Sequence, residues 1–564
     1  MRSRPWETYY GNTPSNISYP NVGMYELVSN AAKKFADRPA YGFMGSITTF
    51  GKMMEEIDAL SEALALHGTT KGDTVVICLP NCPQAIWSVY AVNRCGAISK
   101  LVYPLSSKNE IREQIINSHC KLAIVIDSIA SEFIEASEGT ELNTIVYTNL
   151  GDPLRLMGKI AVKWLDGPKA EVPPSTKTTE MSDFVENRKG VVPKMPDVFG
   201  TDKALMLSSG GTSGKVKEIV ISNLNANASA LQAQAMIDNM EEGNCKTLTV
   251  MPLFHGFGLI GNLHMVLAYG GCCEMVPRFN PGMFAELIGA VKPDIIMGVP
   301  TLYQYLFTSD SLKGMDLSFL KTVIVGGDAL TSALRKKIEE TFAEHGCNTV
   351  VRDGYGLTEC VMLTCMTPKN GCREGYIGIP CPDTFFKIVE TGTEKEKPYG
   401  EVGQICISGP TVMQMYNDNR DEYAPLRTHS DGMMWLHTGD LGLMDSDGYI
   451  AYRGRIDRMV ISSGYNVYPN QVEEILNSHS AIDCSCVIGI PDEIKTYVVR
   501  AFVVLNKNVE KTDQLVKEIQ RYCQDNLPRY SVPKDIRVVK SMPKTKVGKI
   551  SYKDLDEENG TQTC

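Results

Sequence analysis

The sequence predicts an α/β protein with an added β-rich part and a mixed C-terminal segment. Three observations support this fold class. Short apolar runs alternate with helix-spaced segments, a texture of short strands and turns begins near Gly378, and a compact mixed segment follows Arg455. Strand, helix and strand at this pitch form parallel βαβ units, whereas short strands broken by Gly, Pro and Asp pair antiparallel. A length of 564 residues gives room for several such units.

The βαβ pattern is clearest in the N-terminal part of the chain. Residues 55–66 and 83–93 have the apolar spacing of helices. The β-branched run at 74–79 and residues 97–102 predict two strands, and the sequence LAIVI at 122–126 predicts a buried one. We therefore expect a parallel sheet covered by helices.

The same rhythm returns near residue 290. Residues 293–296 and 322–325 predict strands, and residues 333–345 predict a helix before a strand at 349–352. This recurrence predicts a second parallel sheet. It also places the chain that follows each strand at one edge of that sheet, where ligands of open α/β sheets collect.

The remaining segments have other textures. The sequences GIPCPDTFFKIVE, GEVGQICISGP and DGYIAYRG predict short antiparallel strands from about residue 378. Residues 470–477 and 512–524 predict helices in the C-terminal segment. Residues 166–200 are rich in Pro, Lys, Thr and Glu and predict a surface loop.

Composition excludes several classes of function. The chain has 56 Lys and Arg against 66 Asp and Glu, a net charge of −10, which makes general nucleic-acid binding unfavourable. Its 17 cysteines form no paired CxxC pattern of a zinc site. The number of cysteines is odd, and the N-terminus has no apolar segment of the kind found in a secretory signal. Both observations predict a cytoplasmic protein with reduced thiols.

One stretch is long enough to span a bilayer. No Asp, Glu, Lys or Arg occurs between Thr247 and Cys273. The stretch also contains Pro252, several glycines and two histidines, which would be unfavourable in a lipid-facing helix. We therefore expect a buried strand, loop and helix here and no transmembrane segment.

A loop rich in glycine and hydroxyl groups is the strongest local signal. Between two apolar strands, residues 208–217 read SSGGTSGKVK. Glycines let backbone N–H groups turn toward a polyphosphate, hydroxyls donate further bonds and lysines supply charge. A flexible linker is the alternative. The loop is not a Walker A motif, because Ser209 and Val216 stand where that motif needs Gly and a hydroxyl residue.

Three further segments carry candidate chemistry. In DGYGLTE, Tyr355 offers a stacking face for a base, Thr358 a phosphate donor and Glu359 a hard carboxylate for Mg²⁺. In HTGD, Asp440 could accept hydrogen bonds from ribose hydroxyls. Lys549 lies near the end of the chain in PKTKVGKIS. Taken singly, the first two segments are typical of ordinary turns and Lys549 of a solvated lysine.

Together, these segments resemble the adenylate-forming enzymes, and most closely the acyl-CoA synthetases of the fatty acyl and coumaroyl CoA ligase type. The resemblance runs from about residue 25 to 555 and includes GDTVVICLPNCPQAI and GVPTLYQYL. It implies a large N-terminal domain, residues 1–454, with two doubly wound α/β subdomains and a β-rich subdomain at about 378–454. A hinge at 455–458 would join it to a small mobile α+β lid, residues 459–564.

The resemblance also implies a nucleotide site. The residues that would wrap the β- and γ-phosphates are Ser209, Gly210, Gly211, Thr212, Ser213, Gly214 and Lys217. Tyr355 would face adenine, Thr358 the α-phosphate and Glu359 the magnesium. Asp440 and Arg455 would hold the ribose.

The lid has implied roles of its own. Lys549 would act in the first half-reaction, and Asp457 would be the hinge. Gly464 would line the route of the pantetheine arm of coenzyme A. His255, in MPLFHGFG, would stand between that route and the acyl pocket.

The chain departs from the family pattern at six positions: Ser213, Val216, Glu218, Asn223, Asp353 and Arg458. Glu218 replaces a glycine, and a carboxylate beside a phosphate loop is unfavourable unless it points away or pairs with Lys215 or Lys217. These changes leave the principal positions intact. They also leave open a degenerate member that binds nucleotide as a sensor or scaffold.

The resemblance implies a two-step activity. A carboxylate attacks ATP to give an acyl-adenylate and pyrophosphate, and the thiol of coenzyme A then displaces AMP. An amino-acid-activating enzyme that loads a carrier protein and an oxygenase of the luciferase type are the alternatives. The stretch around His255 has no acid to pair with a substrate ammonium, which favours an apolar acid, and the resemblance implies a fatty acid. Expected partners are that acid, ATP, coenzyme A and Mg²⁺, with no nucleic acid; peripheral membrane contact is left open.

Overall fold

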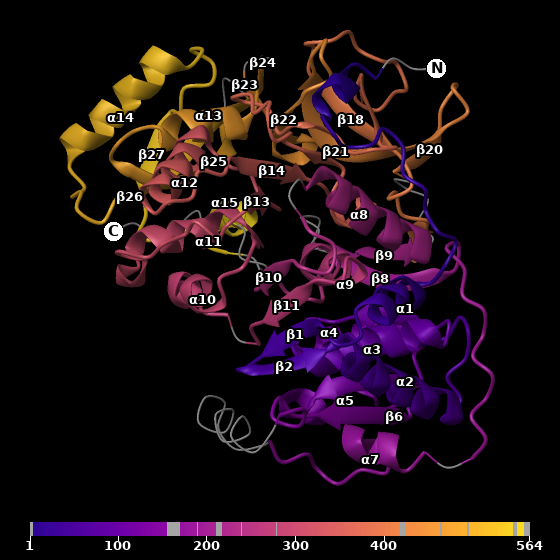
Figure 1. The fold of residues 1–564 in the computed structure, drawn as a ribbon. Coiled ribbons are helices and arrows are strands. Elements are labelled where there is room, and N and C mark those ends of the chain that lie inside the picture. The colour runs from indigo at the N-terminus through magenta and orange to yellow at the C-terminus, as the bar shows by residue number, and fades with distance from the viewer. Residues whose placement is uncertain are drawn as a thin grey trace.

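The computed structural model describes ten segments of the chain: 4–154, 170–188, 190–209, 217–237, 240–277, 279–417, 425–462, 465–492, 496–544 and 550–557. Within these segments the strands form four sheets (Figure 1). The fold is α/β, with two large sheets of mainly parallel strands, one antiparallel sheet and a smaller C-terminal sheet, as the sequence predicts.

The first large sheet has the strand order β19-β9-β8-β4-β3-β5-β6-β7. Its strands are β3 (Thr74–Cys78), β4 (Ile98–Leu101), β5 (Leu122–Ile126), β6 (Thr144–Thr148), β7 (Thr178–Glu180), β8 (Lys203–Ser209), β9 (Lys217–Ser222) and β19 (Met415–Tyr416). The strands from β8 to β7 in this order are parallel, and β8 pairs antiparallel with β9. All five residues of β5 are buried, because helices cover both faces of a parallel sheet.

Helices follow or precede most of these strands. They are α2 (Phe50–Leu66), α3 (Pro83–Arg94), α4 (Lys108–Ser118), α5 (Ala130–Ala136) and α7 (Met181–Glu186). The start of α4 has a clear local cause, since Ser107 and Glu110 form a reciprocal capping box. Strand β7 and helix α7 lie within residues 166–200, so the prediction of a loop there is wrong in part. Elements this short do not stand out in a composition rich in Pro and Lys.

The second large sheet has the order β16-β15-β14-β13-β12-β10-β11-β1-β2. Its strands are β1 (Pro39–Phe43), β2 (Ser46–Thr49), β10 (Lys246–Thr249), β11 (Cys272–Met275), β12 (Ile295–Gly298), β13 (Thr322–Gly326), β14 (Val351–Tyr355), β15 (Cys365–Met366) and β16 (Ile379–Pro380). The order β14-β13-β12-β10-β11-β1 is parallel throughout. Strand β14 continues through Tyr355, so residues 353–355 belong to a strand and not to the turn that the sequence suggested.

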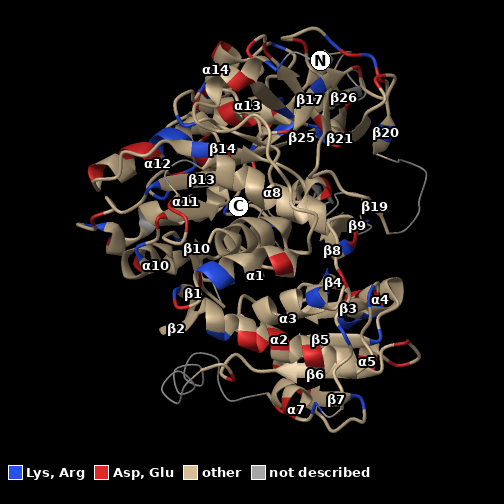
Figure 2. Ribbon diagram, turned by 45° about the vertical axis from the view of Figure 1, so that its right-hand side comes forward, with Lys and Arg blue, Asp and Glu red and all other residues tan. Residues whose placement is uncertain are grey.

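A layer of helices lies between the two large sheets (Figure 1). It contains α1 (Met24–Lys34), α3, α8 (Asn223–Met236) and α9 (Met265–Ala268), with the π-helical turn η3 (Phe257–His264) leading into α9. Helix α8 has no charged residue and is tan along its length in Figure 2. One apolar core includes side chains from this layer and from both sheets. Helices α10 (Phe284–Val291), α11 (Pro300–Gln304) and α12 (Ser332–Glu344) connect strands of the second sheet.

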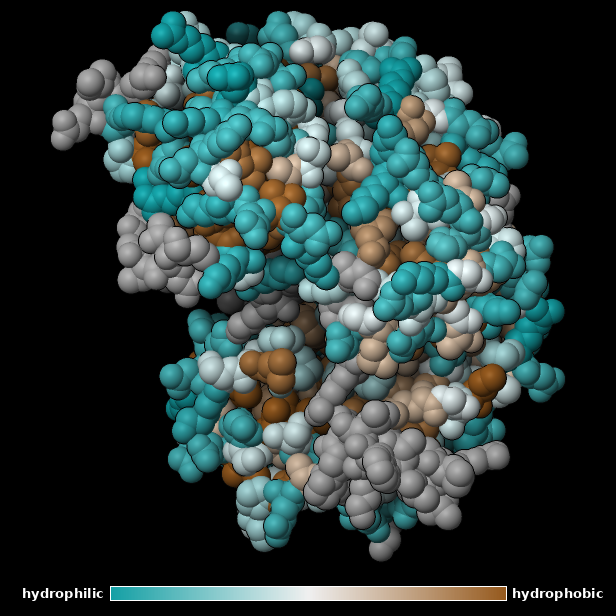
Figure 3. Space-filling view, turned by 90° about the vertical axis from the view of Figure 1, so that its left-hand side faces the viewer, coloured by the Kyte–Doolittle hydropathy of each residue, from teal (hydrophilic) through white to brown (hydrophobic). Residues whose placement is uncertain are grey.

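The stretch between Thr247 and Cys273 contains most of β10, then η3, α9 and the start of β11. The predicted succession of strand, loop and buried helix is confirmed. Among the described residues, no helix has the length and apolar character needed to cross a bilayer. On the face shown in Figure 3, apolar side chains occur in small groups among hydrophilic ones.

The β-rich sheet is antiparallel. Its strands are β17 (Phe385–Val389), β18 (Gly403–Ser408), β20 (Leu426–Thr428), β21 (Met434–Met444) and β22 (Ile450–Arg455). Strand β21 includes all of the sequence HTGD, so Asp440 lies in a strand, beside a register shift, rather than in a turn before a hairpin. A bulge of this kind re-aims a side chain without ending the strand.

The C-terminal part forms a mixed sheet with helices. Its elements are β23 (Val460–Ser462), β24 (Tyr465–Val467), α13 (Pro469–Asn477), β25 (Ile482–Asp492), β26 (Thr496–Leu505), α14 (Asp513–Asn526), β27 (Asp535–Val538) and α15 (Tyr552–Glu557). An apolar cluster of its own includes Val472, Val499 and Ile519. In Figure 1 these yellow elements lie beside α11 and α12.

Candidate active site

Strands β12, β13 and β14 end at a common edge of the second large sheet. The residues that follow these strands converge there, as expected for ligand sites of open α/β sheets. A cavity at this edge is lined by Gly326, Gly327, Gly354, Gly356 and Thr358, together with apolar side chains. The volume of the cavity is about 90 Å³. The predicted site residues can be placed around this cavity.

Tyr355, Asp440 and Arg455 form one cluster, joined by a hydrogen bond and an ion pair. The hydroxyl of Tyr355 donates to Asp440 Oδ2 at 2.6 Å, and Arg455 Nη1 lies 3.2 Å from Asp440 Oδ1. The sequence separates Tyr355 from Asp440 by 85 positions, and the end of β14 and the middle of β21 bring them together. Burial raises the pKa of Asp440, and the neighbouring Arg455 opposes that rise.

Two further aromatic rings stand beside Tyr355. The ring centroids of Phe386 and Tyr452 lie 6.4 Å and 6.0 Å from that of Tyr355. Tyr355 thus has aromatic neighbours on β17 and β22. The cluster combines aromatic rings with a buried carboxylate, which suits a ligand that has both a ring and hydroxyl groups.

Glu359 lies in the short 3₁₀ turn η7 (Thr358–Cys360) that follows β14. Its Oε1 accepts a hydrogen bond of 2.9 Å from the hydroxyl of Tyr416 on β19. The ammonium of Lys217, at the start of β9, lies 5.1 Å from the centre of the Tyr416 ring. Tyr416 therefore contacts two residues that the sequence assigned to magnesium and phosphate. A carboxylate held in this way fits a hard cation such as Mg²⁺.

His255 lines the cavity with Phe257 and Thr358. Two glycines next to it allow close packing of the backbone. A Cβ on Gly256 would lie 1.9 Å from the carbonyl oxygen of Val361, and one on Gly258 would lie 2.0 Å from that of Pro252. The two glycines do not line the cavity themselves, but Gly256 lets the His255 segment pack against Val361, at the end of the turn that carries Thr358.

The rest of the cavity is apolar. Its remaining lining includes Ala233, Ile237, Met265, Met297, Ile324 and Met366. None of the described lining residues is an Asp, Glu, Lys or Arg. An uncharged, apolar group fits such a lining, because burying an unpaired charge there is costly.

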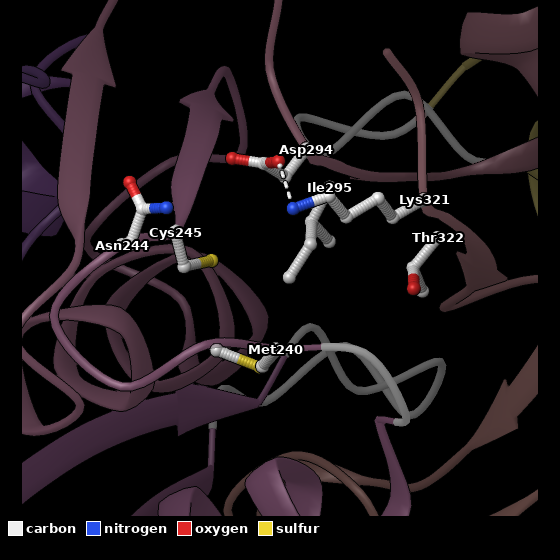
Figure 4. Close-up of a pocket in the computed structure, with 7 residues that line it drawn as sticks. All are labelled: Met240, Asn244, Cys245, Asp294, Ile295, Lys321 and Thr322. Atoms are coloured by element: carbon white, nitrogen blue, oxygen red, sulfur yellow. Dashed lines mark ion pairs between the residues drawn. The ribbon is translucent and has the colours of Figure 1, made fainter. Parts of the chain in front are cut away.

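A second hollow lies toward the other ends of β12 and β13 (Figure 4). Its lining residues are Met240, Asn244, Cys245, Asp294, Ile295, Lys321 and Thr322. Asp294 and Lys321 form an ion pair of 2.9 Å, drawn dashed in Figure 4. The hollow has no room for a water-sized molecule. It is therefore a packing gap rather than a second site.

The predicted hinge contacts the C-terminal part directly. Asp457 accepts a hydrogen bond of 3.3 Å from the hydroxyl of Tyr552, and its other oxygen lies 3.9 Å from Arg455 Nε. Arg458, one of the departures from the family pattern, pairs with Glu473 at 2.6 Å. The guanidinium of Arg458 also lies 4.8 Å from the centre of the Tyr552 ring. Arg458 is thus anchored on the C-terminal side of the hinge.

Several predicted site residues lie outside the described residues. They are Gly210, Gly211, Thr212, Ser213, Gly214, Gly464 and Lys549. Of Ser209 only the backbone is described, and it pairs with Lys217 across β8 and β9.

Like Arg458, two further departures from the family pattern have charged partners. Glu218 is buried and pairs with Lys100 on β4, so the alternative that it would pair with Lys215 or Lys217 is wrong. Lys100 was missed because it lies 118 positions away and belongs to no motif. Asp353 pairs with Arg335 of α12.

Tyr416 is the functional candidate that sequence reasoning missed. It stands in TVMQMYNDN, which carries no recognisable chemistry. Only the pairing of Tyr416 with Ile219 on β9 places its ring beside Lys217 and Glu359. A search for aromatic residues near the phosphate loop would need that pairing in advance.

Two family models match this chain, one in its large N-terminal part and one in its C-terminal part. A family model described as "AMP-binding enzyme" matches residues 28–417, and "AMP-binding enzyme C-terminal domain" matches residues 471–549. The chain belongs to the family of AMP-binding enzymes. This AMP-binding enzyme is 32% identical to a long-chain-fatty-acid--CoA ligase of Bacillus subtilis (strain 168), over 98% of each chain. It is 26% identical to a probable 4-coumarate--CoA ligase 3 of Dictyostelium discoideum, also over 98% of each chain.

Solved structures agree on the fold. The anthranilate CoA ligase AuaEII, in complex with anthranoyl-AMP, superimposes with a TM-score of 0.82 at 23% identity, over 97% of this chain and 98% of that one. ATP-bound MatB from Rhodopseudomonas palustris gives a TM-score of 0.80 at 22% identity, over 94% and 98%. The arrangement of the large sheets and the C-terminal part is therefore that of known AMP-binding enzymes.

Proposed function

We propose that this AMP-binding enzyme is an ATP-dependent acyl-CoA synthetase that activates a fatty acid. One observation carries the proposal: an apolar cavity with no charged lining residue opens beside Thr358, next to the Tyr355–Asp440–Arg455 cluster. The long-chain-fatty-acid--CoA ligases among the relatives support the same substrate class. An amino acid would place its ammonium in this lining without a partner, which disfavours an amino-acid-activating enzyme.

In the first step, a carboxylate oxygen of the acid attacks the α-phosphorus of ATP. A bond to the acyl oxygen forms, the bond to the β-phosphate oxygen breaks, and pyrophosphate leaves. The protein supplies no nucleophile, so its task is positioning and charge stabilisation. Tyr355 would hold adenine, Asp440 and Arg455 the ribose, and Thr358 the α-phosphate.

Two residues would balance charge in this step. Lys549 would donate to the carboxylate and the α-phosphate. Glu359, oriented by Tyr416, would hold Mg²⁺. When bound, the ion would neutralise charge on the departing pyrophosphate. Ser209 to Lys217 would bind the β- and γ-phosphates.

In the second step, the thiol of coenzyme A attacks the acyl carbon and AMP leaves. His255 would stand between the acyl cavity and the incoming thiol, because it lines the cavity together with Thr358. Residues 459–564 would turn about Asp457 between the steps, so that Lys549 and Gly464 serve different half-reactions. We place the large domain at 1–454 and the hinge at 455–458.

We also infer a reducing compartment such as the cytoplasm. The cysteines of the described residues are free thiols, and burial raises the pKa of many of them, for example Cys78 and Cys381. Buried thiols of this kind are inert and suit a protein that does not depend on disulfides.

The proposal is tested by offering a panel of carboxylic acids with ATP and Mg²⁺, with and without coenzyme A. We expect pyrophosphate release that depends on a fatty acid, and thioester only when coenzyme A is present. Glu359→Gln is the matched control and should lower pyrophosphate release severely, because an amide is a poor ligand for Mg²⁺. A clear preference for free amino acids would contradict the proposal, as would nucleotide binding without turnover on any acid.

A further inference from the structure

A buried ion pair lies at the base of the strands that carry the expected phosphate loop. Lys100 on β4 pairs with Glu218 on β9, and the two residues are 1% and 4% exposed. Strand β8 runs between β4 and β9 in the sheet, so the pair spans three strands. Residues of these two types are rarely buried unless they are paired. The family pattern has a glycine where this chain has Glu218.

The register fixes how close the pair is to the loop. Strands β8 and β9 end at the pair Ser209–Lys217, and the next pair along is Ser208–Glu218. Successive side chains of a strand point to opposite faces. Lys217 is directed to the ring of Tyr416, whereas Glu218 is buried against Lys100. The backbone of Glu218 therefore lies one residue, or about 3.3 Å of strand, behind the strand end at Lys217, and its side chain extends toward β4.

Both oxygens of the Glu218 carboxylate have partners. Oε1 contacts the ammonium of Lys100, and Oε2 accepts a hydrogen bond of 3.0 Å from Asn417 Nδ2. The backbone is tied in the same place, since Asn417 N–H donates to the carbonyl oxygen of Glu218 at 2.8 Å. Burial lowers the pKa of Lys100, and Glu218 opposes that effect. The pair holds β4, β9 and the segment of β19 together.

A carboxylate at this position would repel a polyphosphate if it stood alone. Charges interact strongly in a poorly solvated interior, and ATP brings several negative charges to the loop. The ammonium of Lys100 neutralises the Glu218 carboxylate within the buried part of the sheet. We propose that Lys100 is a positioning residue of the nucleotide site, which neutralises Glu218 and fixes the strand end that presents the phosphate loop. The inference rests on the proposed function.

The two partners predict opposite effects on a charged ligand. Lys100→Met leaves a lone carboxylate behind the loop, so ATP binding should weaken. Glu218→Gln leaves a lone ammonium there, so ATP binding should stay as tight or become tighter. AMP lacks the β- and γ-phosphates and should respond less than ATP to either change. A purely structural role would affect both nucleotides and both variants alike.

The test measures equilibrium binding of ATP and of AMP to the full chain, without acid or coenzyme A. The variants are Lys100→Met, Glu218→Gln, the double variant and the conservative Lys100→Arg. We expect Lys100→Met to weaken ATP about tenfold relative to AMP, an effect of one buried charge. Glu218→Gln should not lower the ratio of ATP to AMP affinity. The double variant should return that ratio toward the wild-type value, and Lys100→Arg should largely preserve it.

The single variants can lose stability, because breaking a buried pair costs more than replacing both partners. If Lys100→Met does not fold, Glu218→Gln and the double variant still differ only by the charge of Lys100, and the former should bind ATP more tightly. Equal ratios of ATP to AMP affinity in these variants would overturn the inference. A wild-type chain that binds neither nucleotide would instead contradict the proposed function.

Discussion

The hydroxyl of Tyr416 donates a 2.9 Å hydrogen bond to Glu359 Oε1, while the ring of Tyr416 receives the ammonium of Lys217 at 5.1 Å. One side chain on β19 therefore contacts both the predicted magnesium ligand and the predicted phosphate lysine. These contacts join the two large sheets, because β9 and β19 belong to the first and Glu359 follows β14 of the second. Substitutions of Tyr416 can distinguish the contribution of the hydroxyl from that of the ring.

Tyr416→Phe removes the hydroxyl and keeps the ring. A lost hydrogen bond to a charged group is worth about 1.5–3 kcal/mol, so we expect the Mg²⁺ concentration for half-maximal rate to rise by about tenfold or more. The KM for ATP at saturating Mg²⁺ should change little, because Lys217 keeps its aromatic partner. Initial rates of pyrophosphate release across a Mg²⁺ series measure both quantities.

Tyr416→Leu is the matched comparison, since it also removes the ring. This variant should raise the KM for ATP in addition, by the few-fold that a half-exposed cation–π contact provides. Identical behaviour of the Phe and Leu variants would show that Tyr416 does not hold the two groups separately.

The Asp440 carboxylate gives a prediction about the ribose. It is buried between Tyr355 and Arg455, and the proposed function has it accept hydrogen bonds from ribose hydroxyls. Asp440→Asn should weaken ATP binding by about 10- to 100-fold, the usual loss for hydrogen bonds to a charged group. The affinity for 2′,3′-dideoxy-ATP, which lacks those hydroxyls, should be low for the wild type and nearly unchanged by the substitution. Equal losses for both nucleotides would assign Asp440 a structural role only.

The sequence was informative wherever local chemistry decides the structure. Strand β5 begins and ends as its apolar run predicts, and α13 and α14 lie within two residues of their predicted bounds. Tyr355 and Asp440 entered as candidates because the chain resembles a family, although neither motif stands out alone. Their 2.6 Å contact depends on how two sheets meet, which no local pattern encodes.

The errors have the same origin. The strand that contains Asp440 looks like a turn, because Gly439 and its polar neighbours mimic one. Glu218 was expected to point away from the loop or to pair with Lys215 or Lys217, and its partner Lys100 lies on another strand of the sheet. Sequence reasoning finds partners that are close along the chain. Pairs formed across strands appear only once the strand order is known.

The residues that line the cavity should limit the length of the acyl chain that the enzyme accepts. Ala233 is a small residue of α8 that lines the cavity together with Met297 and Ile324. Ala233→Leu adds volume there, so long-chain acids should lose about tenfold or more in kcat/KM, since each buried methylene contributes about 0.8 kcal/mol. Short-chain acids should be much less affected. Thermal unfolding of the variant checks for overpacking, and an equal loss for every acid would remove the cavity from consideration as the acyl site.

His264 gives a prediction about stability and pH. It is fully buried, Tyr90 donates its hydroxyl to Nδ1 at 2.9 Å, and Nε2–H donates to Asn227 Oδ1 at 2.9 Å. Burial lowers the pKa of His264 to about 3, from an ordinary value near 6.5. Between these values the unfolded chain binds a proton that the native state does not, so the free energy of unfolding falls as the pH falls below 6.5.

The measurement compares the wild type with His264→Gln by chemical denaturation between pH 7 and pH 4. The wild type should lose about 1 kcal/mol per pH unit relative to the variant below pH 6. A profile of His264→Gln parallel to that of the wild type would mean that this histidine is not held neutral.

The hinge and the lid lysine should separate the two half-reactions. Asp457 lies in the short helix η9 (Ile456–Arg458) and contacts Tyr552 of the C-terminal part, whereas Lys549 lies 92 positions farther along the chain. Lys549→Ala should lower adenylate formation by about 10²- to 10³-fold, the usual loss for one positioned charge-stabilising donor. Thioester formation from a supplied acyl-adenylate should survive. Lys546→Ala, in the same sequence PKTKVGKIS, is the matched control and should affect neither step.

Asp457→Pro should have the opposite effect, because proline fixes φ near −65° and restricts the residue before it. A hinge absorbs large backbone changes in few residues, so a stiffened hinge should keep adenylate formation and slow thioester formation. Asp457→Asn tests the contact with Tyr552 without stiffening the backbone, and it should leave both steps within a few-fold of the wild type. Pyrophosphate release reports the first step, and thioester formed from synthetic acyl-adenylate reports the second. If Lys549→Ala impairs both steps equally, or if Asp457→Pro slows adenylate formation alone, the C-terminal part does not alternate about this hinge.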